Sequence, residues 1–252
     1  MAKNKVLITG TSRGIGEALA IRFLNEGWEV NGLSRHKSEN IKKNIKKKSM
    51  FQETIGDLSN IKDVRRFLKK SFGELNFSEY EQIILINNSG VLEPIKAIRD
   101  CETEDILYNL KVNVLGTASI ISEFLKELKE VSLKKMIINI SSGAGKNPYH
   151  GWGSYCTSKA AIDMMTQCIQ LEESTLSAPC RIYSIAPGIV ETKMQETIRT
   201  KSIEEFPMVN KFIDFKESGK LADAKDVAEK YYRFVANESN YKGNTIFNIN
   251  DV

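Results

Sequence analysis

Histidine and cysteine are scarce in this chain, which has two histidines and four cysteines among 252 residues. The cysteines (Cys101, Cys156, Cys168 and Cys180) show no C-x-x-C spacing and have no cluster of histidines nearby. Zinc sites and redox-active dithiols depend on such spacings, so their absence argues against both. We expect no metal site and four reduced thiols.

Long apolar runs are also missing. The longest, Ile83–Ile86 and Met136–Ile140, are far shorter than the ~20 residues that cross a bilayer. The N-terminus leads through Lys3 and Lys5 straight into the short run Val6–Ile8, with no extended apolar segment and no small-residue cleavage site. We therefore expect no membrane segment and a cytoplasmic location.

No strong excess of either charge is present, since 36 Lys and Arg stand against 32 Asp and Glu, a formal net charge of +4. Much of the excess lies in one run of lysines, Lys42, Lys43, Lys46, Lys47 and Lys48. Such a run can contact nucleic acid, but no aromatic residues interleave these lysines to stack on bases. A solvated helix face or loop is the better interpretation, and we expect no nucleic-acid partner.

Short β-branched or apolar runs are present, and most alternate with longer segments that look helical. The runs are 5–9, 29–33, 83–87, 135–141 and 181–186. This alternation predicts a parallel sheet, and the unbroken apolar character of Ile83–Ile86 indicates burial by helices on both faces. With 41% apolar and 27% charged residues and no linker, the whole chain 1–252 is expected to form one α/β domain with a doubly wound sheet.

Three segments between the runs are informative. Ile106–Glu130 and Tyr155–Leu176 have the apolar periodicity of long amphipathic helices. The least regular segment is 188–221, where a helical stretch at 191–199 gives way to Phe-Pro at 206–207. An irregular insertion near the C-terminal edge of a sheet is typical of a substrate lid, which we expect here.

A glycine-rich turn, Thr-Gly-Thr-Ser-Arg-Gly-Ile-Gly over 9–16, follows the first predicted strand and leads into a helical pattern. Glycines in such a turn let the backbone approach a pyrophosphate, and the positive end of the following helix faces the anion. Strand, turn and helix together predict a nucleotide site, although Gly10-x-x-x-Gly14-x-Gly16 departs from the common G-x-G-x-x-G spacing.

The end of the second predicted strand indicates which nucleotide binds. Sites selective for NAD place an acid there for the ribose 2′-hydroxyl, whereas this chain has Gly-Leu-Ser-Arg-His over 32–36. Arg35 can pair with a 2′-phosphate, and Arg13 in the glycine turn adds a second positive charge. We therefore expect NADPH/NADP+ as the cofactor.

Tyr155 and Lys159 form a candidate proton-donating pair. On a helix they leave the same face one turn apart, where the ammonium can favour the phenolate. A free tyrosine titrates near pKa ~10 and needs such a neighbour for acid–base work at neutral pH. Alone, Tyr-x-x-x-Lys is a weak motif.

Other motifs strengthen it. Asn-Asn-Ser-Gly at 87–90, Asn113 and Ser142, thirteen positions before Tyr155, give the chain a resemblance to the short-chain dehydrogenase/reductase family over essentially its whole length. Within the family, 151–165 and 187–195 resemble the sepiapterin reductases and, more closely, the bacterial benzil reductases; 146–149 strengthens the latter match. The resemblance implies a Rossmann-type sheet of about seven strands.

The resemblance also implies residue roles. Tyr155 would donate the proton and Ser142 would orient the carbonyl oxygen. Lys159 would hold the nicotinamide ribose and tune Tyr155, and Asn113 would interrupt its helix and hold a water for proton resupply. With Arg35, Tyr155 and Lys159, the cofactor contacts would be Gly10, Ser12, Arg13, Gly14, Ile15, Gly16, Asp57, Leu58, Asn87, Asn88, Ser89, Gly90, Pro187, Gly188, Val190 and Thr192.

We accordingly expect an NADPH-dependent reductase of a ketone or α-diketone, as in the benzil reductases. A sepiapterin or other pterin reductase is the alternative enzyme, but that subfamily anchors the pterin with an acid near its C-terminus, where Phe247 or Asn248 stands here. A non-catalytic NADP(H)-binding sensor is an alternative of another class, against which the complete catalytic set argues.

Apolar residues around the catalytic helix and the lid are candidates for the pocket wall or, equally, for the core. Their clustering favours an apolar, aromatic carbonyl substrate. The two long helices resemble the family's dimer-forming pair, so we expect a homodimer and leave a tetramer open. The candidates for the wall are Tyr149, Trp152, Met194, Phe206, Met208 and Phe212.

Overall fold

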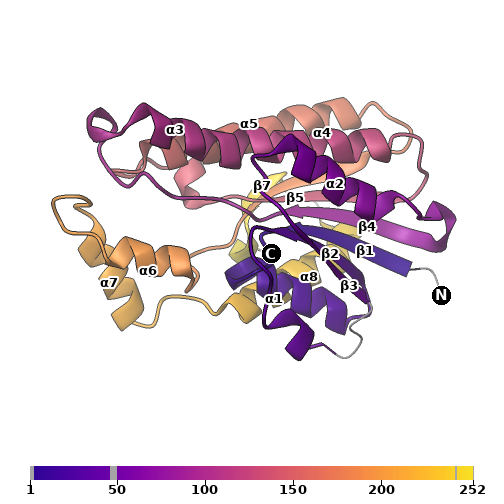
Figure 1. The fold of residues 1–252 in the computed structure, drawn as a ribbon, viewed down its shortest axis with the longest axis horizontal. Helices are drawn as coiled ribbons and strands as arrows, with labels where there is room; N and C mark the ends of the chain where they lie inside the picture. The colour runs from indigo at the N-terminus through magenta and orange to yellow at the C-terminus, as the bar shows by residue number, and fades with distance from the viewer. Residues whose placement is uncertain (1–2, 46–49, 242, 252) are drawn as a thin grey trace.

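Seven parallel strands form the centre of the molecule in the order β3-β2-β1-β4-β5-β6-β7 (Figure 1). The computed structural model describes residues 3–45, 50–241 and 243–251. Because the order runs outward in both directions from β1 and β4, the predicted doubly wound sheet of about seven strands is confirmed. The strands are β1 (Lys3–Thr9), β2 (Glu29–Ser34), β3 (Phe51–Ile55), β4 (Tyr80–Asn87), β5 (Lys134–Ile140), β6 (Cys180–Ala186) and β7 (Ile246–Asn248).

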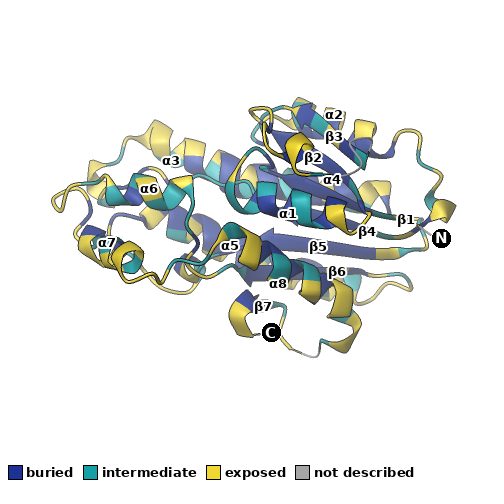
Figure 2. Cartoon of the chain, turned by 90° about the horizontal axis from the view of Figure 1, so that it is seen from below, coloured by how far each residue is buried: buried dark blue, intermediate teal, exposed yellow. Residues whose placement is uncertain are grey.

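Helices cover both faces of this sheet (Figures 1 and 2). One face is covered by α1 (Gly14–Asn25) and α8 (Ala224–Asn237), the other by α2 (Ile61–Phe72), α4 (Thr117–Glu127) and α5 (Gly153–Glu173). The five central strands are buried over most of their length, and Ile83–Ile86 of β4 is 0% exposed. Removal of apolar side chains from water on both faces explains why these strands are continuously apolar rather than alternating.

The predicted long helix at 106–130 consists of three joined parts. α3 (Thr103–Leu110) continues through a π-helical turn, Lys111–Gly116, into α4. Asn113 lies inside the π turn, where the family resemblance implied an interruption. Such turns add a residue to the helical ladder and are frequent at functional sites, because they re-aim a side chain.

The segment after β6 lies beyond the C-terminal ends of the strands (Figure 1) and contains α6 (Lys193–Arg199) and α7 (Val209–Glu217). Its two ends are joined, since the amide of Glu191 donates to the carbonyl of Ala222 at 3.0 Å and the amide of Ala222 donates to the carbonyl of Ile189 at 2.9 Å. This pairing brings both ends of the predicted lid to one point. Its motion stays a prediction.

Three features of the structure concern helix length, possible metal ligands and the lysine run. None of the helices in 3–45, 50–241 and 243–251 has the length and apolarity needed to cross a membrane. Over the same ranges no three histidine, cysteine or acidic residues are grouped as metal ligands. Lys42 and Lys43 are exposed, while Lys46, Lys47 and Lys48 lie outside the described residues.

Candidate active site

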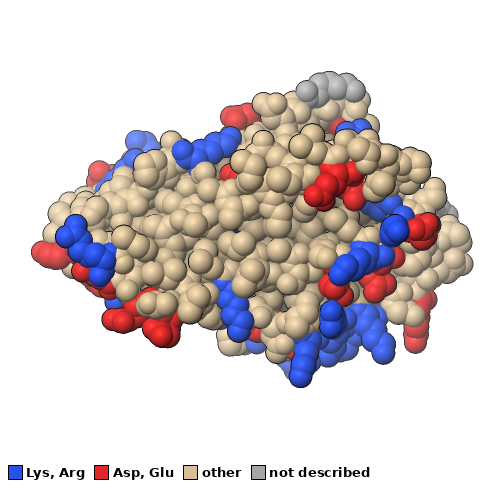
Figure 3. Space-filling model, turned by 90° about the horizontal axis from the view of Figure 1, so that it is seen from above, with Lys and Arg blue, Asp and Glu red and all other residues tan. Residues whose placement is uncertain are grey.

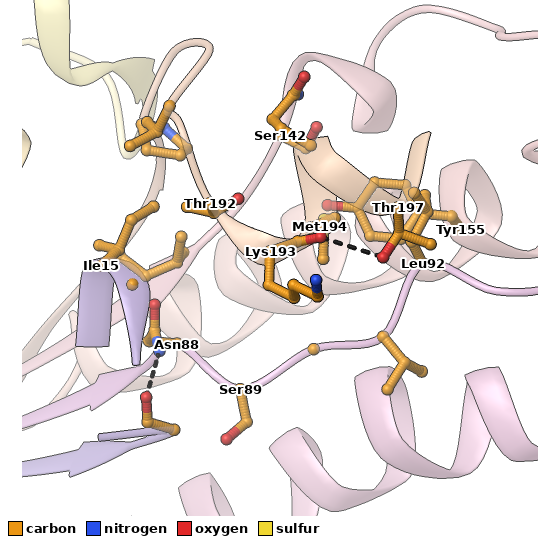
Figure 4. Close-up of a pocket in the computed structure, with 18 of the residues that line it drawn as sticks. Ile15, Asn88, Ser89, Leu92, Ser142, Tyr155, Thr192, Lys193, Met194 and Thr197 are labelled. Carbon is orange, nitrogen blue, oxygen red and sulfur yellow. Dashed lines mark hydrogen bonds between the residues drawn. The ribbon is translucent and has the colours of Figure 1, made fainter. Parts of the chain in front are cut away.

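A cavity of about 870 Å³ lies at the C-terminal ends of the strands. It begins at the loops after β1 and β2, passes the ends of β4 and β5, and reaches the segment that contains α6 and α7. Figure 4 shows Ser142 and Tyr155 on one side of it, with Ile15 and Asn88 toward the other. Ligands of doubly wound sheets bind at this edge, where the strand order reverses.

The glycine turn forms one end of the cavity. Gly10 and Gly14 have φ values of 79° and 59°, which favour glycine. A Cβ on Gly16 would lie 2.2 Å from the carbonyl oxygen of Gly10, so no larger residue fits there. Arg13 provides no side-chain cap for α1, and its first-turn N–H groups are therefore available to an anion. These features fit a dinucleotide pyrophosphate.

The loop after β4 supports the turn. The side-chain amide of Asn88 donates to the carbonyls of Thr9 (3.0 Å) and Gly10 (3.2 Å). In return, the Thr9 hydroxyl accepts from the backbone amides of Asn88 and Ser89, both at 3.0 Å. The paired-asparagine motif thus holds the shape of the glycine turn.

Arg35 lies at the end of the cavity formed by the loop after β2. It is exposed, and its Nη1 donates to the hydroxyl of Tyr108 on α3 at 2.8 Å. Arg13, Asp57 and Leu58 line the same cavity. The cavity thus has two guanidinium groups, and no carboxylate stands directly after β2. This combination suits a phosphorylated ribose better than a free 2′-hydroxyl.

The end of β5 and the first turns of α5 bring Ser142, Tyr155 and Lys159 together. Ser142 follows β5, and its Oγ accepts from the amide of Ala144 at 3.2 Å. Lys159 donates from Nζ to the carbonyl of Ile140 at 2.7 Å and lies 5.6 Å from the centroid of the Tyr155 ring. The i, i+4 spacing expected for the pair is therefore present on α5.

Burial controls the charge states of this pair. Burial raises the pKa of Tyr155 to about 12, although the hydrogen bond with the Ser142 side chain lowers this pKa in part. Burial also lowers the pKa of Lys159 to about 8, although the negative charge of Asp163 acts to raise it. Burial therefore outweighs the lowering of the Tyr155 pKa that we expect from Lys159, and the net shift is upward. The phenol instead retains its proton over the neutral range, which suits a proton donor.

Asn113 is buried beside the catalytic helix rather than in the cavity wall. Its Oδ1 accepts from the amide of Val91 at 2.8 Å, and its Nδ2 donates to the Val91 carbonyl at 2.8 Å and to the Ser158 hydroxyl at 3.1 Å. A Cβ on Gly90 would lie 3.4 Å from the Oδ1 and 3.8 Å from Lys159 Nζ. Gly90 therefore keeps the space between these two side chains open.

Trp152 is the centre of an aromatic cluster next to Tyr155. It stacks on Tyr149 with ring centroids 4.8 Å apart and on Phe206 at 5.4 Å, and it contacts Phe212 at 5.3 Å. Tyr149, Trp152 and Phe212 line the cavity, as does Met194. An apolar, mostly aromatic wall results.

Some predicted site residues lie elsewhere. Phe206 is 0% exposed behind Trp152, and neither it nor Met208 lines the cavity, which corrects their assignment to the pocket wall. Gly16 lies beneath the turn, and Asn87 points into the sheet, where its amide donates to Asn139 at 2.8 Å. The remaining cofactor candidates line the cavity: Gly10, Ser12, Arg13, Gly14, Ile15, Arg35, Asp57, Leu58, Asn88, Ser89, Gly90, Tyr155, Lys159, Pro187, Gly188, Val190 and Thr192.

The cavity also contains residues that sequence reasoning missed. Leu92, Ile198 and Phe215 line its apolar part. Leu92 closely follows the Asn-Asn-Ser-Gly motif, and Ile198 lies one helical turn after Met194 on α6, on the same side as a residue that the sequence analysis named. Of the two C-terminal alternatives, Asn248 lines the cavity, whereas Phe247 is in the core.

The fold, the glycine turn and the Ser142–Tyr155–Lys159 arrangement define an oxidoreductase that uses a nicotinamide cofactor on CH–OH and C=O groups. The family model described as short chain dehydrogenase matches residues 4–203, and the chain belongs to this family.

Individual relatives are similar along most of the chain. The benzil reductase ((S)-benzoin forming) of Bacillus cereus is 38% identical over 244 residues, which cover 96% of this chain and 97% of that protein. The sepiapterin reductase of Meriones unguiculatus is 29% identical over 251 residues, with 94% and 93% covered. The solved structure of ElxO with NADP bound superposes with a TM-score of 0.76 at 28% identity, covering 99% of this chain and 97% of that one.

Proposed function

We propose that this protein is an NADPH-dependent carbonyl reductase acting on ketones or α-diketones. The observation that carries the proposal is the position of Tyr155: a buried phenol that retains its proton lines the cavity together with Ser142 and Lys159. Such a group can donate a proton to a carbonyl oxygen. Similarity to a benzil reductase over nearly the full length of both chains supports the same reaction.

The cofactor contacts follow from the chemistry at the two ends of the cavity. The glycine turn and the N-terminus of α1 would hold the pyrophosphate, and Arg35 with Arg13 would pair with the 2′-phosphate. The NADP-bound neighbour of similar fold supports this choice of cofactor. When bound, the reduced nicotinamide supplies the hydride that the carbonyl carbon receives.

The protein's own groups complete the reduction. The Ser142 hydroxyl donates a hydrogen bond to the substrate oxygen, and Tyr155 transfers its phenolic proton to that oxygen as negative charge develops on it. The ammonium of Lys159 stabilises the resulting phenolate. Asn113, fixed by the backbone of Val91, is proposed to hold the water through which the proton is resupplied.

An α-diketone suits this cavity better than a pterin. The C-terminal segment that would supply a pterin-anchoring acid presents the amide Asn248 to the cavity, and Asp251 does not line it. The wall of Tyr149, Trp152 and Phe212 matches aryl groups flanking a carbonyl.

Comparison of NADPH oxidation with benzil and with sepiapterin tests the proposal. We expect turnover with benzil and at least tenfold lower kcat/KM with sepiapterin. Turnover with sepiapterin alone would transfer the proposal to pterin reduction. NADPH binding without turnover in a wider screen of ketones, diketones and pterins would favour the non-catalytic sensor instead.

A further inference from the structure

Two successive turns of α5 hold successive residues at the end of β5. Lys159 donates to the carbonyl of Ile140 at 2.7 Å. One turn later, Asp163 accepts at its Oδ1 a 2.6 Å hydrogen bond from the hydroxyl of Ser141, the residue directly before Ser142. Because Tyr155, Lys159 and Asp163 are spaced by four, all three lie along one side of the helix.

Asp163 is a buried carboxylate at 6% exposure. Its Oδ1 also accepts from the hydroxyl of Ser184 on β6 at 2.5 Å. A Cβ on Gly145 would lie 2.6 Å from its Oδ2, so the loop after Ser142 packs directly against the second oxygen. A carboxylate is costly to bury without hydrogen bonds or a cation, and here it has two hydroxyl donors and a lysine one turn away.

We propose that Asp163 is a positioning residue for carbonyl reduction: its carboxylate fixes the Ser141–Ser142 segment and places a negative charge one helical turn from Lys159. The inference rests on the proposed function, and it adds a charged group beneath the Ser142–Tyr155–Lys159 set. Asp163 touches neither the cavity nor a substrate, so it acts through Ser141 and Lys159.

The surroundings of Lys159 explain why this charge matters. Lys159 donates to the Ile140 carbonyl at the end of β5, and only the space at Gly90 separates its Nζ from the side-chain oxygen of Asn113 in the π turn; both of these neighbours are uncharged. On α5 itself, the Tyr155 ring lies 5.6 Å away, and the charge of Asp163 opposes the lowering of the lysine pKa by burial. Loss of the carboxylate charge would leave that lowering unopposed.

Asp163→Asn separates charge from shape, because the amide oxygen can still accept from Ser141 and Ser184. The alkaline limb of the pH profile of kcat/KM for carbonyl reduction should move down by about one unit, because a nearby opposite charge shifts a pKa by roughly 1–3 units. That shift corresponds to a roughly fivefold loss at pH 8 and approaches tenfold above it, with most activity retained near pH 6. Ser141→Ala and Ser184→Ala are matched controls that remove one hydroxyl each but keep the charge, and the limb should stay in place.

An alkaline limb that stays in place in Asp163→Asn, or that moves equally in the two serine variants, would overturn the inference. A second readout avoids turnover: the ¹³Cε resonance of Lys159, assigned with Lys159→Met, should titrate about one unit lower in Asp163→Asn than in the unmodified chain. If the unmodified chain reduces no diketone, the proposed function fails while this NMR comparison still decides the role of Asp163. Equal titration midpoints in the two proteins would reject that role.

Discussion

Burial favours the neutral forms of the two central side chains, Tyr155 and Lys159. The Tyr155 phenol, 6% exposed, retains its proton to a pKa of about 12, and the Lys159 ammonium loses its proton near a pKa of about 8. A reductase needs the phenol protonated and a cation beside it as the phenolate forms. Both conditions hold below the lysine pKa, so in the proposed reaction Lys159 rather than Tyr155 would set the upper pH limit.

The pH profile of the unmodified enzyme follows directly. The kcat/KM for carbonyl reduction should be level near pH 7 and fall as pH rises through about 8, because Lys159 becomes neutral while Tyr155 is still protonated. Stopped-flow NADPH oxidation from pH 6 to 10 would measure it. A profile that stays level to pH 10 would contradict this assignment of the limb.

Tyr155→Phe removes the proposed proton donor and keeps the ring. The ring's edge-to-face contact with Trp152, at 5.8 Å between centroids, should survive, so NADPH affinity should change by less than about threefold. The kcat should fall by roughly 10²-fold or more, the usual contribution of a positioned acid. Tyr149→Phe, which keeps the stack on Trp152, is the control and should retain most turnover. Full activity in Tyr155→Phe would rule out the proposed mechanism.

Arg35→Asp tests the cofactor preference. The change removes the guanidinium proposed for the 2′-phosphate and places an acid at the end of β2, so the KM for NADPH should rise at least tenfold and that for NADH should fall. Tyr108→Phe is the matched control, because it deletes only the hydrogen bond to Arg35. Unchanged NADPH affinity with no gain for NADH would show that Arg35 does not read the phosphate.

At the scale of elements, burial on both faces made five strands predictable, because a continuous apolar run has few alternatives. The edge strands were harder to predict. β3 buries Phe51 and Thr54 but exposes its other residues in part or in full, and β7 has three residues held by β6. The π turn at Asn113 leaves the apolar periodicity of 106–130 intact, so its presence came from the family resemblance alone.

The site residues also differ in how well the sequence predicts their positions. The glycine turn and Tyr155–Lys159 are local in sequence, and their spacing fixes their geometry. The pocket wall depends on how the segment 189–222 packs on α5, and no local pattern distinguishes Phe206, hidden behind Trp152, from Phe212, which faces the cavity. The sequence does not distinguish Asp163 from an ordinary helix residue, since its partners Ser141 and Ser184 come from the end of β5 and from β6.

The close backbone approach in the turn between β1 and α1 can be tested by mutation. Gly16→Ala would push a methyl group against the carbonyl of Gly10, a backbone atom that cannot move aside easily. We expect a loss of roughly 2 kcal/mol in the free energy of unfolding and at least tenfold weaker NADPH binding. Gly153→Ala is the control: its nearest neighbour would be Ile98 Cδ1 at 3.5 Å, an ordinary contact. Thermal melts with and without NADPH measure both effects, and equal melts for the two variants would contradict the close-approach argument.

At the scale of the whole molecule, the face formed by α3, α4 and α5 is poor in charge over a broad area (Figure 3). It carries exposed apolar side chains, including Leu107, Leu115, Met164 and Leu171, which are 58–72% exposed. Exposed apolar groups gathered on one face are typical of an interface. This face includes both long helices of the sequence analysis, so the homodimer stays our prediction.

Leu171→Lys tests that prediction. A lysine in an apolar interface between two copies would have to bury its charge or separate the helices, and either effect weakens association. Sedimentation velocity should show a dimer for the unmodified chain and a larger monomer fraction for Leu171→Lys at the same concentration. Ile203→Lys is the matched control, because Ile203 is also exposed, at 52%, but lies in the segment between α6 and α7. A monomeric unmodified chain would reject the homodimer. A dimer that Leu171→Lys leaves intact would place the interface on another face, and α5 would then order its catalytic side chains without a partner.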